Sequence, residues 1–195
     1  MPTYIILLGP PGAGKGTQAK RLADRLEVPH VSTGDLFRAM KGVDTPLARR
    51  VQEIMARGDL VDDQTTVEIV EERLSRQDCE QRGAILDGFP RNPYQADALK
   101  SLLERRGAQV SLVLLIDVPR QIAIERILGR ARQEGRTDDT LEVAERRYEV
   151  YLAETEPLIR YYEAAGLLRA VDGDQTIDAV TAALLKVIEQ VTGVY

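Results

Sequence analysis

Short, continuous runs of apolar residues recur along the chain and constrain its fold more than any other feature. Four of them cover Tyr4–Leu8, Ala84–Leu86, Val110–Ile116 and Leu167–Val171, in which Ser111 and Arg169 are the only polar residues. Continuous runs of this length, without alternating polar residues, are typical of parallel strands that are covered on both faces. A shorter fifth strand is expected near His30–Val31. The runs therefore predict a parallel sheet of five strands.

Helical patterns lie between these predicted strands. They cover Lys15–Leu26, Pro46–Met55, Thr65–Ser75, Pro93–Arg105, Pro119–Leu128, Leu141–Tyr162 and Ile177–Val191. A strand followed by a helix, repeated along the chain, forms right-handed crossover units in a doubly wound α/β sheet. A chain of 195 residues, of which 44% are apolar, is long enough for one well-buried core.

Two segments fit this alternation poorly, and we interpret them as insertions outside the sheet. Residues 32–61 carry helical patterns with no strand between them, and residues 129–139 are polar and charged. The remaining segments, 1–31, 62–128 and 140–195, would form the core. Ligands of such sheets bind beyond the carboxyl ends of the strands, so the loops that leave those ends are where chemistry is expected.

The composition argues against several other classes of protein. A net charge of −5 does not favour a nucleic-acid-binding surface. With one cysteine, Cys79, and one histidine, His30, neither an internal disulfide nor a Cys/His metal cluster is expected, and both residues are interpreted as ordinary packing or surface residues. No apolar stretch reaches the roughly 18 residues of a membrane span, and no secretory leader is recognised, so we expect a cytoplasmic protein without a membrane partner.

The segment Gly9–Thr17, GPPGAGKGT, joins the first predicted strand to the first predicted helix. Glycines let the backbone wrap around phosphate oxygens, successive amide groups form an anion nest, and the helix N-terminus adds partial positive charge. Lys15 supplies a full positive charge toward the outer phosphates. The setting predicts a phosphate-binding loop; the alternative is a glycine-rich turn without a ligand. Gly16 stands where most such loops carry a serine or threonine.

The form of this loop resembles the nucleoside monophosphate kinases of the adenylate kinase type. The resemblance continues in STGDLFR (Ser32–Arg38), GDLV (Gly58–Val61), LDGFPRNPYQ (Leu86–Gln95), GR (Gly129–Arg130), GRTDD (Gly135–Asp139) and RR (Arg146–Arg147). It implies a P-loop core, an NMP-binding insertion at residues 32–61 and a short LID at residues 129–139. The implied reaction is ATP + AMP ⇌ 2 ADP, catalysed by a monomer.

The resemblance also assigns site residues. For ATP it implies Gly12, Ala13, Gly14, Lys15, Gly16, Thr17, Arg126, Arg130 and Gln175. For AMP it implies Thr33, Arg38, Asp59, Leu60, Val61, Gly88, Phe89, Pro90, Arg91, Gln95, Arg136 and Arg147, with Gln95 on the adenine edge. The implied catalytic set is Lys15, Asp87, Arg91, Arg130, Arg136 and Arg147. Guanidinium groups suit this work because they grip phosphate with two hydrogen bonds and stay charged.

The metal expectation follows from the same resemblance. Asp87, at the carboxyl end of its predicted strand, would hold Mg²⁺ through water, while substrate phosphates and solvent replace the hydroxyl that Gly16 lacks. Some relatives have a long lid with a zinc site of four cysteines, but residues 129–139 contain neither cysteine nor histidine, so no zinc is expected. Asp138 and Asp139 would help to hold the lid closed.

Rival interpretations remain open. A UMP/CMP kinase shares GKGTQ and GFPRN, although Thr33 and Gln95 fit the adenylate pattern. A non-catalytic nucleotide sensor would bind ATP without transferring phosphate. Taken alone, Gln95 on an early helical turn is expected to be exposed, and for Arg132 and Arg146 a solvated face and a functional role are both open.

Overall fold

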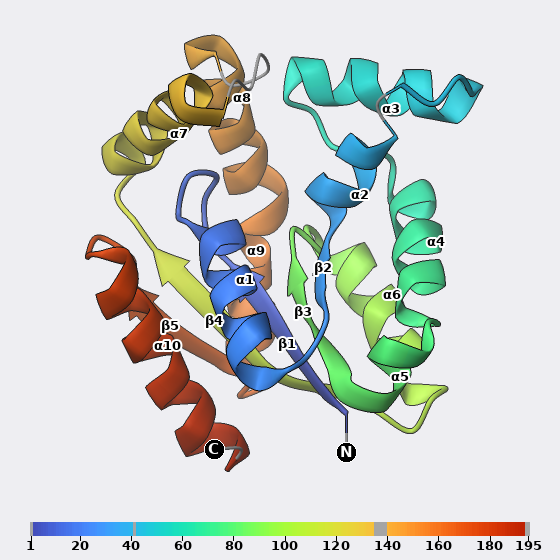
Figure 1. Ribbon diagram of the computed structural model, residues 1–195, viewed down its shortest axis with the longest axis vertical. Helices are drawn as coiled ribbons and strands as arrows, with labels where there is room; N and C mark the ends of the chain where they lie inside the picture. Colours follow the sequence, from blue (N-terminus) through green and yellow to red (C-terminus); the bar gives the residue numbers. More distant parts are fainter. Residues whose placement is uncertain (1, 41, 135–139, 194–195) are drawn as a thin grey trace.

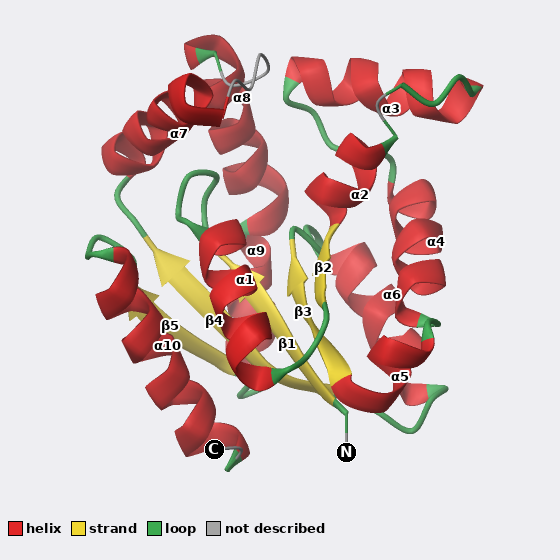
Figure 2. Ribbon diagram, viewed as in Figure 1, coloured by secondary structure: helices red, strands yellow, loops and turns green. Residues whose placement is uncertain are grey.

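The computed structural model describes residues 2–40, 42–134 and 140–193 of the chain. Its centre is an all-parallel sheet of five strands in the order β2-β3-β1-β4-β5, with helices on both faces (Figures 1 and 2). The strands are β1 (Thr3–Leu8), β2 (His30–Ser32), β3 (Gly83–Asp87), β4 (Val110–Asp117) and β5 (Leu168–Asp172). The predicted doubly wound, five-stranded parallel sheet is confirmed.

The helices connect these strands and cover them. They are α1 (Lys15–Leu26), α2 (Thr33–Ala39), α3 (Pro46–Arg57), α4 (Asp63–Leu74), α5 (Gln77–Arg82), α6 (Pro93–Glu104), α7 (Arg120–Glu134), α8 (Leu141–Val150), the π-helical turn η1 (Tyr151–Thr155), α9 (Pro157–Ala164) and α10 (Ile177–Thr192). Within the described ranges, none of them is long and apolar enough to cross a bilayer.

Alternate side chains of the central strand β1 are buried on opposite faces of the sheet. Ile6 belongs to the cluster under α4, α6 and α9, whereas Ile5 and Leu7 belong to the cluster under α1 and α10. Ile5 and Ile6 are both fully buried. This two-sided burial explains why the strand reads as a continuous apolar run rather than an alternating one.

The order of the strands fixes where a ligand can bind. From β1 the chain passes to β2 and β3 on one side and then crosses to β4 and β5 on the other, with β1 paired to both β3 and β4. Ligands of doubly wound sheets bind at such a reversal, beyond the carboxyl ends of the strands. The glycine-rich loop leaves β1 at this place.

Helices α2 and α3 form an arm above the carboxyl ends of β2 and β3, on the far side of the molecule from α7 (Figure 1). The arm has a small core of its own, made by Phe37, Val51 and Val61. Thr45 caps the N-terminus of α3 and accepts a hydrogen bond from Ala48 N at 3.2 Å. The arm is therefore an ordered helical unit attached to the sheet.

Two of the predicted helices differ from the observed ones by more than a residue or two at an end. Helix α7 continues beyond Leu128 to Glu134, so residues 129–134 are helical rather than a polar loop. Gly129 costs only about 1 kcal/mol in a helix, and the residues around it favour one. The single helix predicted over 141–162 is divided by η1, because Pro157 lacks the N–H group that a continuous helix needs and instead begins α9.

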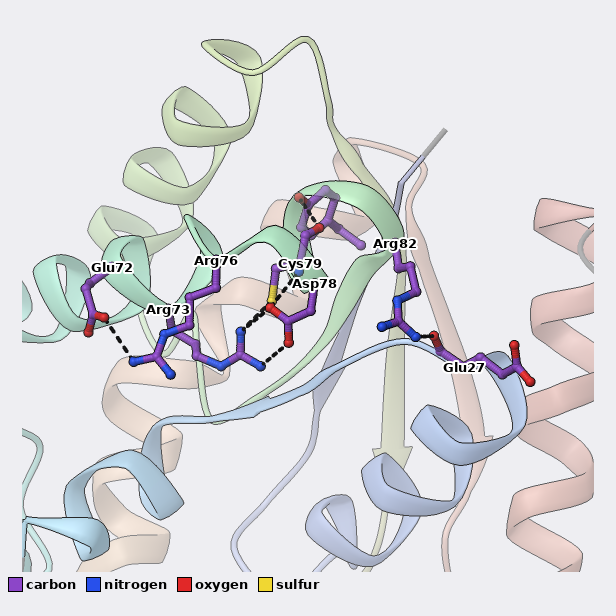
Figure 3. Close-up of polar contacts among 8 residues, drawn as sticks. Glu27, Glu72, Arg73, Arg76, Asp78, Cys79 and Arg82 are labelled. Carbon is purple, nitrogen blue, oxygen red and sulfur yellow. Dashed lines mark hydrogen bonds and ion pairs between the residues drawn. The ribbon is translucent and has the colours of Figure 1, made fainter.

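Helix α5 was not predicted, because its polar residues show no apolar periodicity. Arg73 of α4 anchors it by donating hydrogen bonds to Asp78 Oδ2 at 2.8 Å and to Cys79 Sγ at 2.9 Å (Figure 3). Tyr4 in β1 adds a bond from its hydroxyl to the Cys79 carbonyl at 3.1 Å. Cys79 is fully buried, as a packing residue is expected to be.

Candidate functional site

The glycine-rich loop joins β1 to α1, as predicted, and is held tightly to its surroundings. Gly12 has a φ of 85°, and a Cβ atom there would overlap the backbone carbonyl of Ala123 in α7. A larger residue would strain the backbone and displace the helix. Lys15 begins α1, and its Nζ donates hydrogen bonds to Gly9 O and Pro10 O, both at 2.8 Å. The lysine side chain therefore lies along its own loop.

The electrostatic environment of Lys15 is unusual for a lysine. Burial lowers its pKa from about 10.5 to about 8; Asp87 counteracts this effect, whereas Arg91 and Arg130 reinforce it. The ammonium group thus lies near two further positive charges as well as the carboxylate of Asp87. Such a place favours a polyanion that restores the charge balance.

Asp87 ends β3 and faces this cluster. Burial by itself would raise its pKa, but His30, Lys15 and Arg91 together hold the pKa below its ordinary value near 3.8. The Asp87 carboxylate is therefore ionised at neutral pH. His30 Nε2 lies 3.6 Å from Asp87 Oδ2, too far for a hydrogen bond, and it has no hydrogen-bond partner among the described residues. His30 was expected to be an ordinary packing or surface residue, but its side chain lines the same pocket as Asp87.

The residues around Asp87 fit Mg²⁺ bound mainly by substrate. Mg²⁺ in nucleotide sites takes one or two carboxylates and leaves its other positions to phosphates and water. Asp87 supplies an ionised carboxylate, and no cluster of three or more histidine, cysteine or acidic residues is found in the described ranges. A Cβ atom on Gly16 would lie 3.5 Å from Asp87 Oδ2, so the carboxylate faces the place where other loops present a hydroxyl.

A second group of residues meets at the carbonyl of Gly88. Thr33 Oγ1 and Arg91 Nε both donate to this oxygen at 2.9 Å. Gly88 has a φ of 79°, and a Cβ atom there would lie 2.7 Å from Thr33 Oγ1. Burial lowers the pKa of Arg91; Asp87 opposes that effect, whereas Arg147 and Arg38 add to it. Positive charge therefore gathers on this side of the site as well.

Gln95 is buried, contrary to the expectation from its place on an early helical turn. Its Oε1 accepts from Arg91 N at 2.8 Å, and its Nε2 donates to Asp63 Oδ1 at 2.9 Å. Asn92 Nδ2 donates to the same oxygen of Asp63 at 2.8 Å. Because an amide has two N–H groups and a carbonyl with two lone pairs, Gln95 keeps capacity for one further partner of each kind.

Arg126 and Gln175 lie together at the other end of the site. Arg126 Nη1 donates to Gly173 O at 2.9 Å, and Gln175 Nε2 donates to Asp172 Oδ2 at 3.0 Å. The first of these bonds joins α7 to the loop that follows β5. This loop and α7 thus form one wall, opposite the arm.

One pocket of about 670 Å³ connects these groups. It brings together almost all the predicted site residues: Gly12, Ala13, Gly14, Lys15, Gly16, Thr17, Thr33, Arg38, Asp59, Leu60, Val61, Asp87, Gly88, Pro90, Arg91, Gln95, Arg126, Arg130, Arg147 and Gln175. Phe89 is the exception, because its side chain is 2% exposed and packs in the core under α4 and α6. Arg136, Asp138 and Asp139 lie outside the described residues.

Three residues near the site were missed by the sequence analysis: His30, Asp63 and Asn92. The position of His30 near Asp87 results from the pairing of β2 with β3. Asp63 and Asn92 are 29 residues apart and meet only in the folded chain. The Asn92 side chain also accepts from Gln95 N at 2.9 Å and so caps α6, a role that its place before Pro93 could have indicated.

Comparison with known proteins agrees with this geometry. The adenylate kinase family model matches residues 7–167. An adenylate kinase of Xanthomonas campestris pv. campestris (strain B100) is 48% identical over 189 residues, which cover 97% of this chain and 98% of that protein. One of Cyanothece sp. (strain PCC 7425 / ATCC 29141) is 45% identical over 189 residues, covering 97% and 96% of the two chains. The chain therefore belongs to the adenylate kinase family.

Proposed function

We propose that this protein transfers the terminal phosphoryl group of ATP to AMP and gives two molecules of ADP. The proposal depends mainly on one observation: the same pocket is lined by the phosphate-binding loop and by a second group of positive charges around Arg91. The adenylate kinase relatives support the same reaction. A protein that only sensed a nucleotide would not need the second cluster.

The donor side would be built from the loop and the wall opposite the arm. The amide groups of residues 12–17 and the ammonium group of Lys15 would hold the ATP phosphates. Arg126 and Gln175 would lie near the adenine, and Arg130 near the phosphates. Burial has already weakened the solvation of Lys15, so an arriving phosphate would meet a charge that water compensates poorly.

The acceptor side would be the arm together with the loop after β3. Arg38, Arg91 and Arg147 would hold the monophosphate, and their guanidinium groups remain charged throughout turnover. The backbone of residues 59–61 and the remaining hydrogen-bonding capacity of Gln95 would select adenine. Because one chain lines both sides of the pocket, a monomer is sufficient for the reaction.

Phosphoryl transfer requires alignment and neutralised charge more than covalent help from the protein. Five positively charged side chains would surround the phosphoryl group and stabilise its charge in the transition state: Lys15, Arg91, Arg130, Arg136 and Arg147. Mg²⁺, when bound with ATP, supplies further neutralisation and alignment of the phosphates, and Asp87 would hold it through water. Closure of the arm and of residues 129–139 would exclude water that otherwise hydrolyses ATP.

An acceptor-specificity assay tests the proposal. Purified protein receives ATP with AMP, CMP or UMP at equal concentration, in Mg²⁺ and in a chelator. We expect rapid formation of ADP with AMP, much slower transfer to CMP and UMP, and loss of activity in the chelator. Preference for CMP or UMP would identify a pyrimidine nucleotide kinase instead, and binding of ATP analogues without transfer would indicate a sensor.

A bisubstrate mimic that joins two adenosines through a phosphate chain tests the pocket independently of turnover. We expect one molecule of the mimic to bind per chain and to exclude both ATP and AMP. Binding that excludes only one of the two nucleotides would contradict a pocket with both sites.

A further inference from the structure

Asp59 lies where the arm returns to the rest of the molecule. It follows Gly58, which caps α3, and it begins the segment 59–61 that lines the pocket. Its carboxylate accepts a hydrogen bond from Arg146 Nε at 3.0 Å, and its other oxygen lies 3.4 Å from Arg57 Nε. Arg57 belongs to the arm, but Arg146 belongs to α8. The bond between Asp59 and Arg146 therefore joins the arm to α8.

The backbone beside this bond is packed closely against α8. A Cβ atom on Gly58 would lie 3.2 Å from Val143 O and 3.2 Å from Arg147 Cγ. Arg147 faces the pocket, whereas its neighbour Arg146 bonds to Asp59. The same turn of α8 thus carries Arg147, which lines the pocket, and Arg146, which bonds to the segment at the border of the pocket.

Among the residues that the structure describes, the neighbouring charged contacts are longer than the bond between Arg146 and Asp59. Arg146 Nη1 also lies 3.9 Å from Glu149 Oε2, one turn along the same helix, and Arg50 of the arm lies 3.7 Å from Asp62 Oδ2. These two contacts are longer than the bond to Asp59. Among the described residues, the 3.0 Å contact is therefore the direct charged bond between this part of the arm and α8.

We propose that Arg146 is a positioning residue for the acceptor side of the pocket. Through Asp59 it fixes the backbone of residues 59–61 relative to Arg147, so that the base and the phosphate of the acceptor are held at a set separation. The inference rests on the proposed function, since it assigns the acceptor to this side. Arg146 itself touches neither substrate.

The size of the effect is limited by solvent. The Arg146 and Asp59 side chains are 53% and 32% exposed, and exposed pairs of this kind change an equilibrium by a factor of about two to five. Removal of the bond should therefore raise the KM and the Kd for AMP about two- to fivefold, and leave the KM for ATP unchanged. Because salt screens exposed charges, the difference from the wild type should shrink as ionic strength rises.

The test uses Arg146→Met, which keeps a flexible stem and removes the guanidinium group. Steady-state assays give KM for AMP and ATP separately, and calorimetry gives the Kd for AMP without turnover. Arg49→Met is the matched control, because it removes an ion pair to Asp44 at 2.6 Å that lies wholly within the arm. We expect Arg49→Met to behave as the wild type.

A double-mutant cycle assigns the effect to the bond. In an Asp59→Asn background, Arg146→Met should cause little further change in the KM for AMP. Arg146→Lys, which keeps the charge but loses the Nε donor, should give an intermediate value if the charge contributes. Circular dichroism melts establish that each variant is folded.

The outcomes separate this inference from the proposed function. If the wild type transfers no phosphate to AMP, the proposed function fails. If the wild type is active but Arg146→Met changes neither KM nor Kd for AMP, or changes the KM for ATP equally, the positioning role is wrong. Additive effects in the double-mutant cycle would likewise overturn it.

Discussion

Replacement of Lys15 by methionine should stabilise the ligand-free protein while removing its response to ATP. Burial lowers the pKa of Lys15 from about 10.5 to about 8. A pKa difference of one corresponds to about 1.4 kcal/mol, so the lowering from about 10.5 to about 8 means that the buried charge costs at most about 3.5 kcal/mol at neutral pH. This is an upper limit, because the side chain is only partly buried and water reaches the pocket.

The substitution also removes favourable contacts. Lys15 donates two hydrogen bonds of 2.8 Å to the carbonyl groups of Gly9 and Pro10, and each contributes about 1 kcal/mol. The difference leaves Lys15→Met at most about 1.5 kcal/mol more stable than the wild type at pH 7. For a chain of 195 residues this upper limit corresponds to a rise in Tm of about 3–6 °C.

The difference in stability between the wild type and Lys15→Met should change with pH. The pKa is lower in the folded state than in the unfolded state, so between pH 8 and 10.5 the unfolded chain binds more protons. The free energy of unfolding of the wild type should therefore rise relative to the variant across this window. The variant is more stable below pH 8, and the wild type, which keeps its hydrogen bonds, becomes more stable near pH 10.5.

Urea unfolding of both proteins from pH 7 to pH 10.5 measures the difference between their free energies of unfolding. The titration of all other groups contributes equally to both proteins and cancels in this difference. Lys186→Met, at an exposed position on α10, serves as the control for the loss of a lysine side chain and should leave the free energy of unfolding at pH 7 nearly unchanged. Melts with and without ATP should show a rise in Tm for the wild type only. A variant that is destabilised by the same amount at every pH would refute the reasoning that the charge of Lys15 opposes folding.

Further predictions concern the acceptor side and the cysteine. Gly88→Ala should raise the KM for AMP about tenfold or more, because a Cβ at φ 79° would press on Thr33 Oγ1; an unchanged KM would contradict the contact. Arg91→Ala should lower kcat by orders of magnitude in a protein that melts normally, and near-normal turnover would refute its role. Burial raises the pKa of Cys79 to about 11, so the thiol should react with an aromatic disulfide reagent at pH 8 only after unfolding; immediate reaction of the native protein would be inconsistent with its burial.

The strands and the phosphate-binding loop could be predicted because their causes are local. Two-sided burial removes most polar residues from a strand, so the interiors of β1 and β4 appear as the apolar runs Tyr4–Leu8 and Leu112–Ile116. The loop between β1 and α1 is marked by its glycines and its lysine. Neither feature needs information about distant parts of the chain.

The features that were missed depend on contacts between distant residues. Helix α5 is held by Arg73 and by the fully buried Cys79, and its polar sequence gives no periodic signal. Gln95 can be buried because Asp63, 32 residues away, accepts a hydrogen bond from its side-chain amide. Phe89 lies between Gly88 and Pro90, which line the pocket, yet its own side chain packs into the core, because the tertiary fold decides where a single side chain points.

The close approach of Gly12 to Ala123 restricts how the molecule can open. The first turn of α7 rests on the donor loop and leaves no room for a methyl group between them. We therefore expect any movement of Arg126 and Arg130 to pivot beyond Ala123, while the start of the helix stays in place. A bulkier residue on either side of this junction should shift that pivot.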